Sequence, residues 1–370
     1  MKRSGSILAT APEGGGGEFT GKHQDNATAS VWKSFLMVLL FPVLMNGAAT
    51  GNYARASQEE SLSKLIEGAK AEGKLTWYTS AILPDATRVI KRFEEKYPFI
   101  KVDAYRGNSV TLTNKLMNEV RAQKHIVDVL NIVAFKASQL NKEHIYSSYF
   151  SPESRTFPET LKDRDGYWAG TNIVPYLMAY NTKLLSRKDV PATFEGLLNP
   201  RWKGKIGFDT KEIEWFANML KIMGEDKGMD FFKKFAAQNL NYRRDRALIR
   251  DLIIAGEFPI GTAYAHQVED RKRDGAPLDW VGISPVIAMF STIGLVAHAP
   301  HPHAAKLFID FNLSQEGQTL IANFGRVPAR PDIESETLKG LKGVKIYTSD
   351  MSLADKFSVY NKKSIEVFGR

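Results

Sequence analysis

Short apolar runs typical of β-strands alternate with helix-periodic segments in the first part of the chain, and this alternation constrains the fold more than any other feature. The strand-like runs are Leu75–Thr79, Val102–Tyr105 and Val127–Val133. The two segments between them, 85–97 and 112–120, carry apolar side chains four residues apart, which places these side chains on one helix face. Strands that alternate with helices predict βαβ units and a parallel sheet. The sequence therefore predicts an α/β fold.

The N-terminal region predicts export. Residues 1–30 are rich in Gly, Ala, Ser and Thr without apolar periodicity, and we expect a disordered leader there. Residues 31–56 contain a lysine, the apolar stretch Phe35–Met45 and the small-residue site Ala54-Arg55-Ala56, which is the layout of a cleaved signal peptide. The apolar stretch of 11 residues is interrupted by a proline and is too short for a transmembrane anchor, which needs about 20. We therefore expect a periplasmic protein that begins at Ser57.

Composition and missing motifs exclude several classes of function. The net charge is +9, but no run of five basic residues occurs, so the charge does not by itself indicate nucleic-acid binding. The chain has no cysteine, which excludes disulfides, thiolate metal sites, cysteine catalysis and a lipid anchor through cysteine. No glycine-rich phosphate loop follows a strand, and neither H-E-x-x-H nor G-x-S-x-G is present.

Three histidines lie close together in the segment AHAPHPHAA at 297–305. Imidazoles at this density could bind a metal ion. However, two prolines hold the segment extended and no carboxylate adjoins it in the sequence. We therefore expect a connector between a strand and a helix.

Several segments resemble one protein family. The most specific is Pro300–Gln318, PHPHAAKLFIDFNLSQEGQ. The other segments that fit are Asn199–Ile206, Ala255-Gly256-Glu257, Gly275-Ala276-Pro277 and Gly343–Tyr347. In these motifs the chain resembles the periplasmic solute-binding proteins of ABC transporters, of the ferric-iron type. The resemblance covers essentially all of residues 57–370.

This resemblance implies a type II periplasmic-binding fold, with two α/β lobes and two crossover strands as hinge. The crossovers would be Asn172–Tyr180 and Ser284–Ala288. Lobe one would then comprise residues 57–172 and 286–370, and lobe two residues 173–285. The protein would close on its ligand without altering it and serve an ABC permease in the inner membrane with its ATPase. The resemblance implies no cofactor, no nucleic acid and a monomer.

Ferric iron is one cargo that the resemblance implies. Iron-binding members of the family commonly carry two adjacent tyrosines near a strand-to-helix turn. Here Tyr264 matches the first, but Ala265 follows it. His266 could still join Tyr264 as a metal ligand, because residues i and i+2 share a face of a strand. One phenol and one imidazole are a small set for a hard cation, which prefers several oxygen ligands, and a buried core tyrosine is the structural alternative.

The other candidate cargo is a small organic anion, such as a phosphonate or a carboxylate, or a thiamine-like organic ligand. The residues expected to bind the ligand are Ser80, Arg106, Asn108, Ser109, Tyr176, Trp215, Tyr264 and His266. Arg106 can pair bidentately with an oxoanion, and Asn108 and Ser109 begin a helix whose N-terminus favours negative charge. The cluster Arg243–Arg246 also precedes a helix, and a solvated helix start is its plain interpretation. An enzyme on the same fold would need a nucleophile and a base in contact, and the sequence identifies none.

Overall fold

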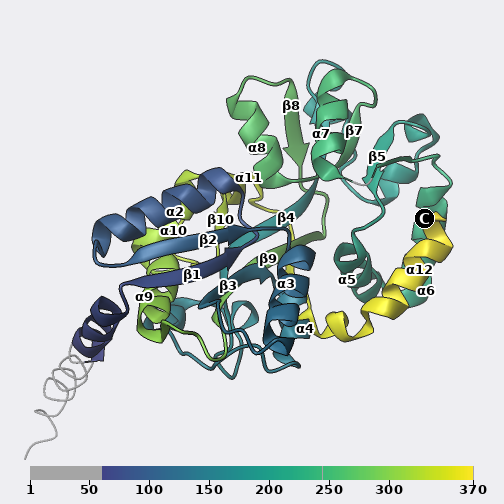
Figure 1. The fold of residues 1–370 in the computed structure, drawn as a ribbon. Helices are drawn as coiled ribbons and strands as arrows, with labels where there is room; N and C mark the ends of the chain where they lie inside the picture. Colours follow the sequence, from purple (N-terminus) through teal and green to yellow (C-terminus); the bar gives the residue numbers. More distant parts are fainter. Residues whose placement is uncertain (1–60, 244, 370) are drawn as a thin grey trace, which may run out of the picture. The chain divides into compact units, whose positions relative to one another are not determined.

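The computed structural model describes residues 61–243 and 245–369. Its first part shows the predicted alternation of strands and helices (Figure 1). After a helix over residues 61–72 come β1 (Lys74–Thr79), α2 (Leu83–Lys96), β2 (Lys101–Arg106), α3 (Ser109–Arg121), β3 (Val129–Val133) and α4 (Ala134–Asn141). Strand β1 lies between β2 and β3 and pairs in parallel with both. These parallel units confirm the predicted α/β class.

The local sequence explains how the first two helices begin and which face they bury. A proline occupies the first turn of α2, where its missing N–H costs no hydrogen bond. Val89 and Phe93 form the buried face of this helix. Helix α3 begins after Asn108, whose side-chain oxygen accepts a hydrogen bond from the Thr111 N–H at 2.9 Å. Such a cap contributes about 1 kcal/mol to helix stability.

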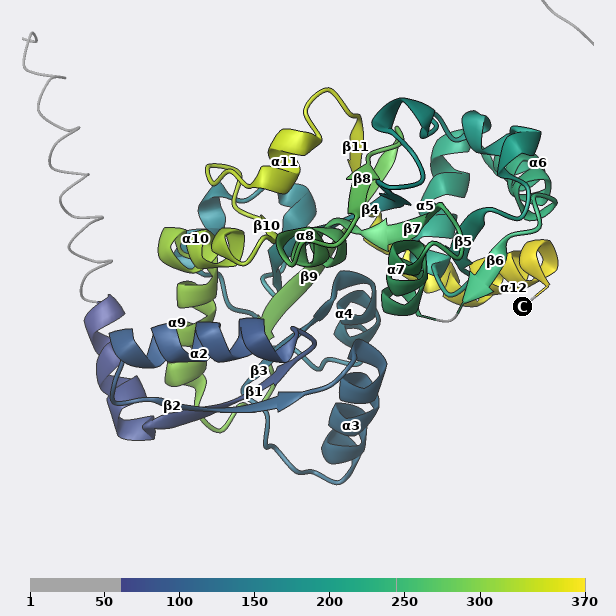
Figure 2. The same ribbon diagram turned by 90° about the horizontal axis from the view of Figure 1, so that it is seen from above.

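Two long strands connect the two halves of the sheet, and Figures 1 and 2 show both passing through its middle. They are β4 (Ala169–Asn181) and β9 (Val286–Leu295) in the strand order β2-β1-β3-β9-β4-β7-β5-β6. Residues 169–175 of β4 pair with β9, whereas residues 176–181 pair with β7 and β8. The predicted crossovers Asn172–Tyr180 and Ser284–Ala288 therefore correspond to β4 and the beginning of β9.

The second half of the sheet is flanked by its own helices. Its elements are β5 (Ile206–Asp209), α5 (Ile213–Met223), α6 (Glu225–Ala236), β6 (Asn241–Arg243), α7 (Arg246–Ala255), β7 (Ile260–Tyr264), α8 (Ala265–Arg273) and β8 (Leu278–Val281). The short 3₁₀ helices before β4 are Pro152–Thr156 and Glu159–Leu161, and those after it are Arg187–Asp189, Glu195–Leu198 and Pro200–Trp202.

Two separate apolar cores define the two lobes. One core contains Trp77, Phe93 and Phe308, and we call the elements around it lobe one. The other contains Phe208 and Phe232, among other aromatic residues, and we call the elements around it lobe two. The two-lobed architecture that the sequence implies is therefore present.

The C-terminal part of the chain contributes to both lobes. Its elements are α9 (Pro302–Leu313), α10 (Gln315–Asn323), β10 (Val327–Pro328), α11 (Glu336–Gly340), β11 (Ile346–Thr348), the 3₁₀ helix Met351–Lys356 and α12 (Phe357–Phe368). The ring of Phe368 lies 5.0 Å from Phe208, 6.1 Å from Phe216 and 6.0 Å from Phe232, measured between centroids. The assignment of all of 286–370 to lobe one is therefore wrong for α12, because aromatic packing places this helix in the core of lobe two.

The other predicted boundaries fall where the lobes share strands. The division between 172 and 173 lies inside β4, and the division between 285 and 286 lies at the beginning of β9. The leader predicted at 1–30 and the signal peptide predicted at 31–56 lie outside the described residues. Within the described ranges, no helix is both long and apolar enough to cross a membrane.

The histidine segment is the connector that the sequence predicts, since it joins β9 to α9. The backbone N–H of His301 donates to Asp128 at 2.7 Å, and its ring Nδ1 lies 2.9 Å from the same carboxylate. The ring Nδ1 of His303 lies 2.6 Å from Glu72 instead. The two imidazoles thus hold different carboxylates. In the part of the chain that the structure describes, no group of three or more His, Asp or Glu side chains is placed to hold a metal ion.

Candidate functional site

The carboxyl ends of three parallel strands meet at one edge of lobe two, and a helix begins beyond each. Strand β5 pairs in parallel with both β6 and β7. Strand β5 ends at Asp209 before α5, β6 ends at Arg243 before α7, and β7 ends at Tyr264 before α8. Helix N-termini present free N–H groups and the positive end of the helix dipole, so they favour negatively charged groups. We call this place the lobe-two edge.

Three of the predicted binding residues form one aromatic cluster at this edge. Tyr176 of β4 lies opposite Tyr264 of β7 in the strand register. The rings of Tyr176 and Trp215 stack with centroids 4.8 Å apart, and Tyr264 meets Tyr176 edge-on at 6.1 Å. Tyr176 and Trp215 are buried. The cluster therefore forms a rigid wall that fixes the position of the Tyr264 ring.

Arg246 and Glu212 form a charged pair that contacts Tyr264 in this cluster. The guanidinium carbon of Arg246, the first residue of α7, lies 3.9 Å from the centroid of the Tyr264 ring. Arg246 also donates to the Tyr264 hydroxyl and forms an ion pair with Glu212. The hydroxyl of Tyr264 lies 3.3 Å from the other oxygen of Glu212. Tyr264 thus packs against the core of lobe two, and its hydroxyl lies between an arginine and a carboxylate.

Burial at the lobe-two edge shifts the pKa values of its titratable side chains. Burial raises the pKa of Tyr264, although the nearby Arg246 opposes this effect. Burial likewise raises the pKa of Asp209, and it raises that of Glu214 to about 7 in spite of a hydrogen bond with Ser349. Burial, with further help from neighbouring arginines, lowers the pKa of His266 well below its ordinary value. At neutral pH Tyr264 is therefore protonated and His266 uncharged.

His266 joins Tyr264 for a different reason from the one predicted. The sequence suggested an extended strand in which the two side chains share a face. The strand ends at Tyr264, and His266 lies in the first turn of α8. The two rings nevertheless stack with centroids 5.7 Å apart and planes inclined by 27°. The pairing expected for these residues is present, but the helix start produces it.

The four predicted residues of lobe one lie at the ends of β1 and β2 and at the beginning of α3. The N–H of Ser80 donates to Asn131 O at 2.9 Å, and the exposed Arg106 reaches only Ala81 O, at 3.4 Å. Asn108 caps α3, and the hydroxyl of Ser109 accepts a hydrogen bond from Val133 N at 3.2 Å. Among the described residues, no hydrogen bond, ion pair or ring contact links these four to the lobe-two edge. Their part in ligand binding therefore stays a prediction.

Two residues of the edge were not identified from the sequence. Arg246 belongs to the cluster Arg243–Arg246, whose plain interpretation is a solvated helix start. No sequence motif marks Glu212 as a site residue. The available signal is the Asp245-Arg246 pair, in which Asp245 caps α7 by accepting from Ala247 N at 2.7 Å. The cap fixes where α7 begins and therefore which residue occupies its first turn. Only the packed structure shows that Arg246, in this turn, lies against Tyr264.

Known proteins resemble this chain in sequence or in fold. A putative 2-aminoethylphosphonate-binding periplasmic protein of Salmonella typhimurium strain LT2 is 27% identical over 167 residues, which is 42% of this chain and 49% of that protein. The fold is similar to that of iron-bound HitA from Pseudomonas aeruginosa, with a TM-score of 0.69, 18% identity and coverage of 79% of this chain and 99% of HitA. It is also similar to AfuA from Actinobacillus pleuropneumoniae with fructose-6-phosphate bound, with a TM-score of 0.69, 23% identity and coverage of 80% and 99%.

The family model for bacterial extracellular solute-binding proteins matches residues 88–344. This range includes β4, β9 and the whole lobe-two edge. The match also extends over most of both lobes, so it concerns the architecture as a whole and not one motif. The chain belongs to the family of bacterial extracellular solute-binding proteins.

Proposed function

We propose that this protein is the periplasmic substrate-binding component of an ABC importer and that it captures a small organic anion at the lobe-two edge. The family, the two lobes and the sequence layout of a signal peptide support the role in import. In this role the protein delivers its cargo unchanged to a membrane permease with its ATPase. It acts as a monomer, without a cofactor and without enzymatic activity.

One observation carries the choice of an anion. The Nε of Arg246 is buried, and it has no hydrogen-bond acceptor among the described residues. A buried charged donor without an acceptor is costly, and an oxygen of a carboxylate or phosphonate would satisfy it. The N-terminus of α7 lies at the same residue and favours the same charge. Arg246 and the helix start therefore form a receptor for an oxoanion.

The carboxylates of the edge refine the class of ligand. Glu212 and Asp209 are buried beside the arginine, and Glu214 gains its charge only near pH 7. A ligand that carries both an ammonium group and an anionic group would find a partner for each here: the carboxylates for the ammonium group and Arg246 for the anion. The Salmonella relative is described as a putative 2-aminoethylphosphonate-binding protein, and this compound is such a zwitterion. An aminophosphonate or amino acid is therefore the first ligand to test.

Ferric iron is the second candidate. HitA was solved with iron bound, and another relative is named iron uptake protein A1, from Synechocystis, with 24% identity over 247 residues. Iron would bind at Tyr264 and His266 as cargo. Against it stands the guanidinium of Arg246, which lies on the Tyr264 ring and would repel the cation.

The remaining walls of the site would come from lobe one. Closure of the lobes about β4 and β9 would bring Ser80, Arg106, Asn108 and Ser109 toward the ligand. Their positions after strands and before a helix support this role, because α/β sheets bind ligands at the carboxyl ends of their strands. Hinge closure would also bury the ligand from water.

A titration of the mature chain, residues 57–370, tests the proposal. Protein freed of bound solute would be titrated by calorimetry against 2-aminoethylphosphonate, other phosphonates, amino acids, citrate and ferric citrate. Native mass spectrometry of the protein as purified would record any retained metal. We expect binding of a member of the organic panel in the absence of iron. Binding of iron alone, with a bound metal in the spectrum, would replace the anion by iron, and binding of none of these would contradict the proposed site.

A further inference from the structure

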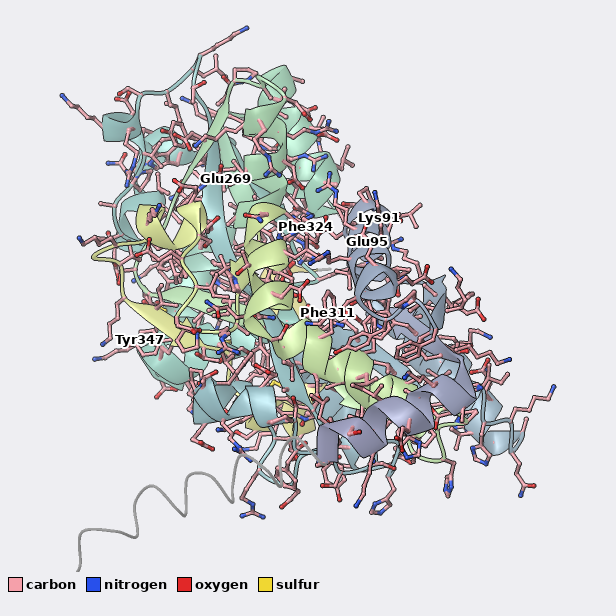
Figure 3. All side chains as sticks on the ribbon, turned by 90° about the vertical axis from the view of Figure 1, so that its left-hand side faces the viewer. Lys91, Glu95, Glu269, Phe311, Phe324 and Tyr347 are labelled. Atoms are coloured by element: carbon pink, nitrogen blue, oxygen red, sulfur yellow. The ribbon has the colours of Figure 1, made fainter. Side chains whose placement is uncertain are left out.

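A turn of lobe one lies against a helix of lobe two near the lobe-two edge. Residues 324–326 connect α10 to β10, and Figure 3 marks Phe324 at this turn, with Lys91 of α2 and Glu269 of α8 on its two sides. Phe324 belongs to the core of lobe one. Helix α8 packs on β8 and β4 through the second half of the sheet. The contact therefore joins the two lobes beside the crossover strand β4, with which β10 pairs at Asn172 and Ile173.

Arg326 is the centre of this contact. Its side chain is only 8% exposed, and its Nε donates to Asp85 of α2 at 2.7 Å. Its Nη1 lies 3.3 Å from Asp270 of α8. Asp85 belongs to the same lobe as Arg326, whereas Asp270 belongs to the other. If the lobes separate, Arg326 keeps Asp85 as a partner and loses only Asp270, so no uncompensated buried charge is created.

A second arginine, this one in lobe two, contacts the turn of lobe one. Arg273, the last residue of α8, donates from Nη2 to the carbonyl oxygen of Phe324 at 3.2 Å. Gly325 permits this approach, since a Cβ atom there would lie 2.9 Å from Nη1 of Arg273. Gly325 also has a φ of +77°, which disfavours other residues. The turn is therefore shaped to receive the arginine.

These contacts share a helix face with the candidate site. His266, Asp270 and Arg273 of α8 follow one another at spacings of four and three residues, so they lie along one face of the helix. His266 stacks on Tyr264 at one end of this face, and Asp270 and Arg273 meet the lobe-one turn farther along. A movement of lobe one that breaks the contacts with Asp270 and Arg273 therefore removes support from α8, the helix that carries His266.

We propose that Arg326 and Arg273, with Asp270, form an interlobe latch that stabilises the closed arrangement of the lobes and positions α8. Arg326 and Arg273 are positioning residues, since they act through α8 and Asp270 and not on the ligand. The latch opens at low cost because each arginine retains a partner in its own lobe: Asp85 for Arg326, and Asp270, at 2.5 Å, for Arg273. The inference rests on the two-lobed fold and holds whichever solute the protein binds.

Distance measurements between the lobes test the latch without any ligand. The chain has no cysteine, so Lys91→Cys on α2 and Lys227→Cys on α6 provide two exposed positions for spin labels. Double electron–electron resonance on the full mature chain would then give the interlobe distance distribution. We expect a short-distance population in the labelled parent protein. Asp270→Asn should lower the ratio of short to long distances about two- to fivefold, which is the effect of losing one partly exposed ion pair.

Two further variants make the test specific. Arg273→Gln removes the contact with Phe324 and should shift the distribution in the same direction as Asp270→Asn. Asp274→Asn removes a charge at the end of α8 that pairs with Arg271 and should leave the distribution unchanged. Arg326→Ala is not chosen, because it would leave Asp85 partly buried without its partner. A parent protein with only the long distance, or unchanged distributions in both Asp270→Asn and Arg273→Gln, would overturn the latch.

Discussion

The two lobes have the same kind of sheet edge but carry different side chains there. In each lobe, parallel strands end where helices begin. At the lobe-two edge, Tyr176 and Trp215 are buried and Tyr264 is fixed by Arg246 and Glu212. In lobe one, Arg106 and Asn108 are exposed, and Asn108 is occupied as a helix cap.

This difference suggests that the two lobes have different roles, one in recognising the ligand and the other in closing over it. Groups that are held before the ligand arrives lose little conformational entropy on binding, whereas exposed flexible side chains must be ordered first. We therefore infer that lobe two supplies most of the binding energy and the choice of ligand, and that lobe one mainly covers the bound solute. Variants in the two lobes should differ accordingly.

Arg246→Gln is expected to have the largest effect. It removes the charge that faces both the Tyr264 ring and the proposed oxoanion, and a charge-assisted hydrogen bond is worth about 1.5–3 kcal/mol. Affinity for an anionic ligand should therefore fall about 10- to 150-fold in a calorimetric titration. Arg243→Gln is the matched control, since Arg243 lies just before the same helix but pairs with Glu257. Equal losses in the two variants would mean that the site lies elsewhere.

The charge of Glu214 should produce a smaller, pH-dependent effect. Its pKa is raised to about 7, so the carboxyl is neutral below this pH and becomes negative above it. The new charge lies near Tyr264, while His266, whose pKa burial lowers well below its ordinary value, stays neutral throughout. Affinity for an anion without an ammonium group, such as citrate, should therefore fall about three- to tenfold between pH 6 and pH 8, by Coulomb repulsion at short range in the protein.

Glu214→Gln should flatten this pH profile. The difference between the parent and this variant separates the carboxyl from the ligand's own titration. Glu225→Gln, on the exposed beginning of α6, serves as the control and should keep the parent profile. A variant profile identical to that of the parent would show that Glu214 does not face the bound anion.

Arg106→Gln is expected to have the smallest effect. Because the side chain is exposed and bound only weakly to Ala81 O, screening by water limits its contribution to about twofold in affinity. The same titration as for Arg246→Gln gives the measurement. If Arg106→Gln lowered affinity as much as Arg246→Gln, the proposed division of roles between the lobes would be wrong.

The sequence predicted those features that depend on local pattern. Apolar runs and helical spacing identified β1, α2, β2, α3 and β3 with boundaries correct to within two or three residues. Tyr264 was identified because it matches the first of the two tyrosines that iron-binding members of the resembling family carry near a strand-to-helix turn. These features are visible because each is encoded within about 15 adjacent residues.

The missed features depend on how distant segments pack. Arg246 and Arg326 look like ordinary surface arginines in the sequence, and only the arrangement of β5, β6 and β7 or of α2 and α8 gives them their partners. Phe368 was likewise placed in the wrong lobe, since an apolar helix face does not indicate which core it will join. Periodicity does not specify side-chain partners such as these, which lie from 18 to 241 residues apart in the sequence.

The pairing of β3 with β9 has a consequence for the way the chain acquires its structure. Asn131 of β3 donates to Thr292 O across a separation of 161 residues, and lobe two is completed only when Phe368 reaches Phe208. Closing loops of this length costs entropy before any contact compensates for it, which slows folding. Neither lobe is a continuous segment that could mature while the other is still being synthesised. The nascent chain should therefore complete the core of lobe two only after residues 357–368 have been synthesised.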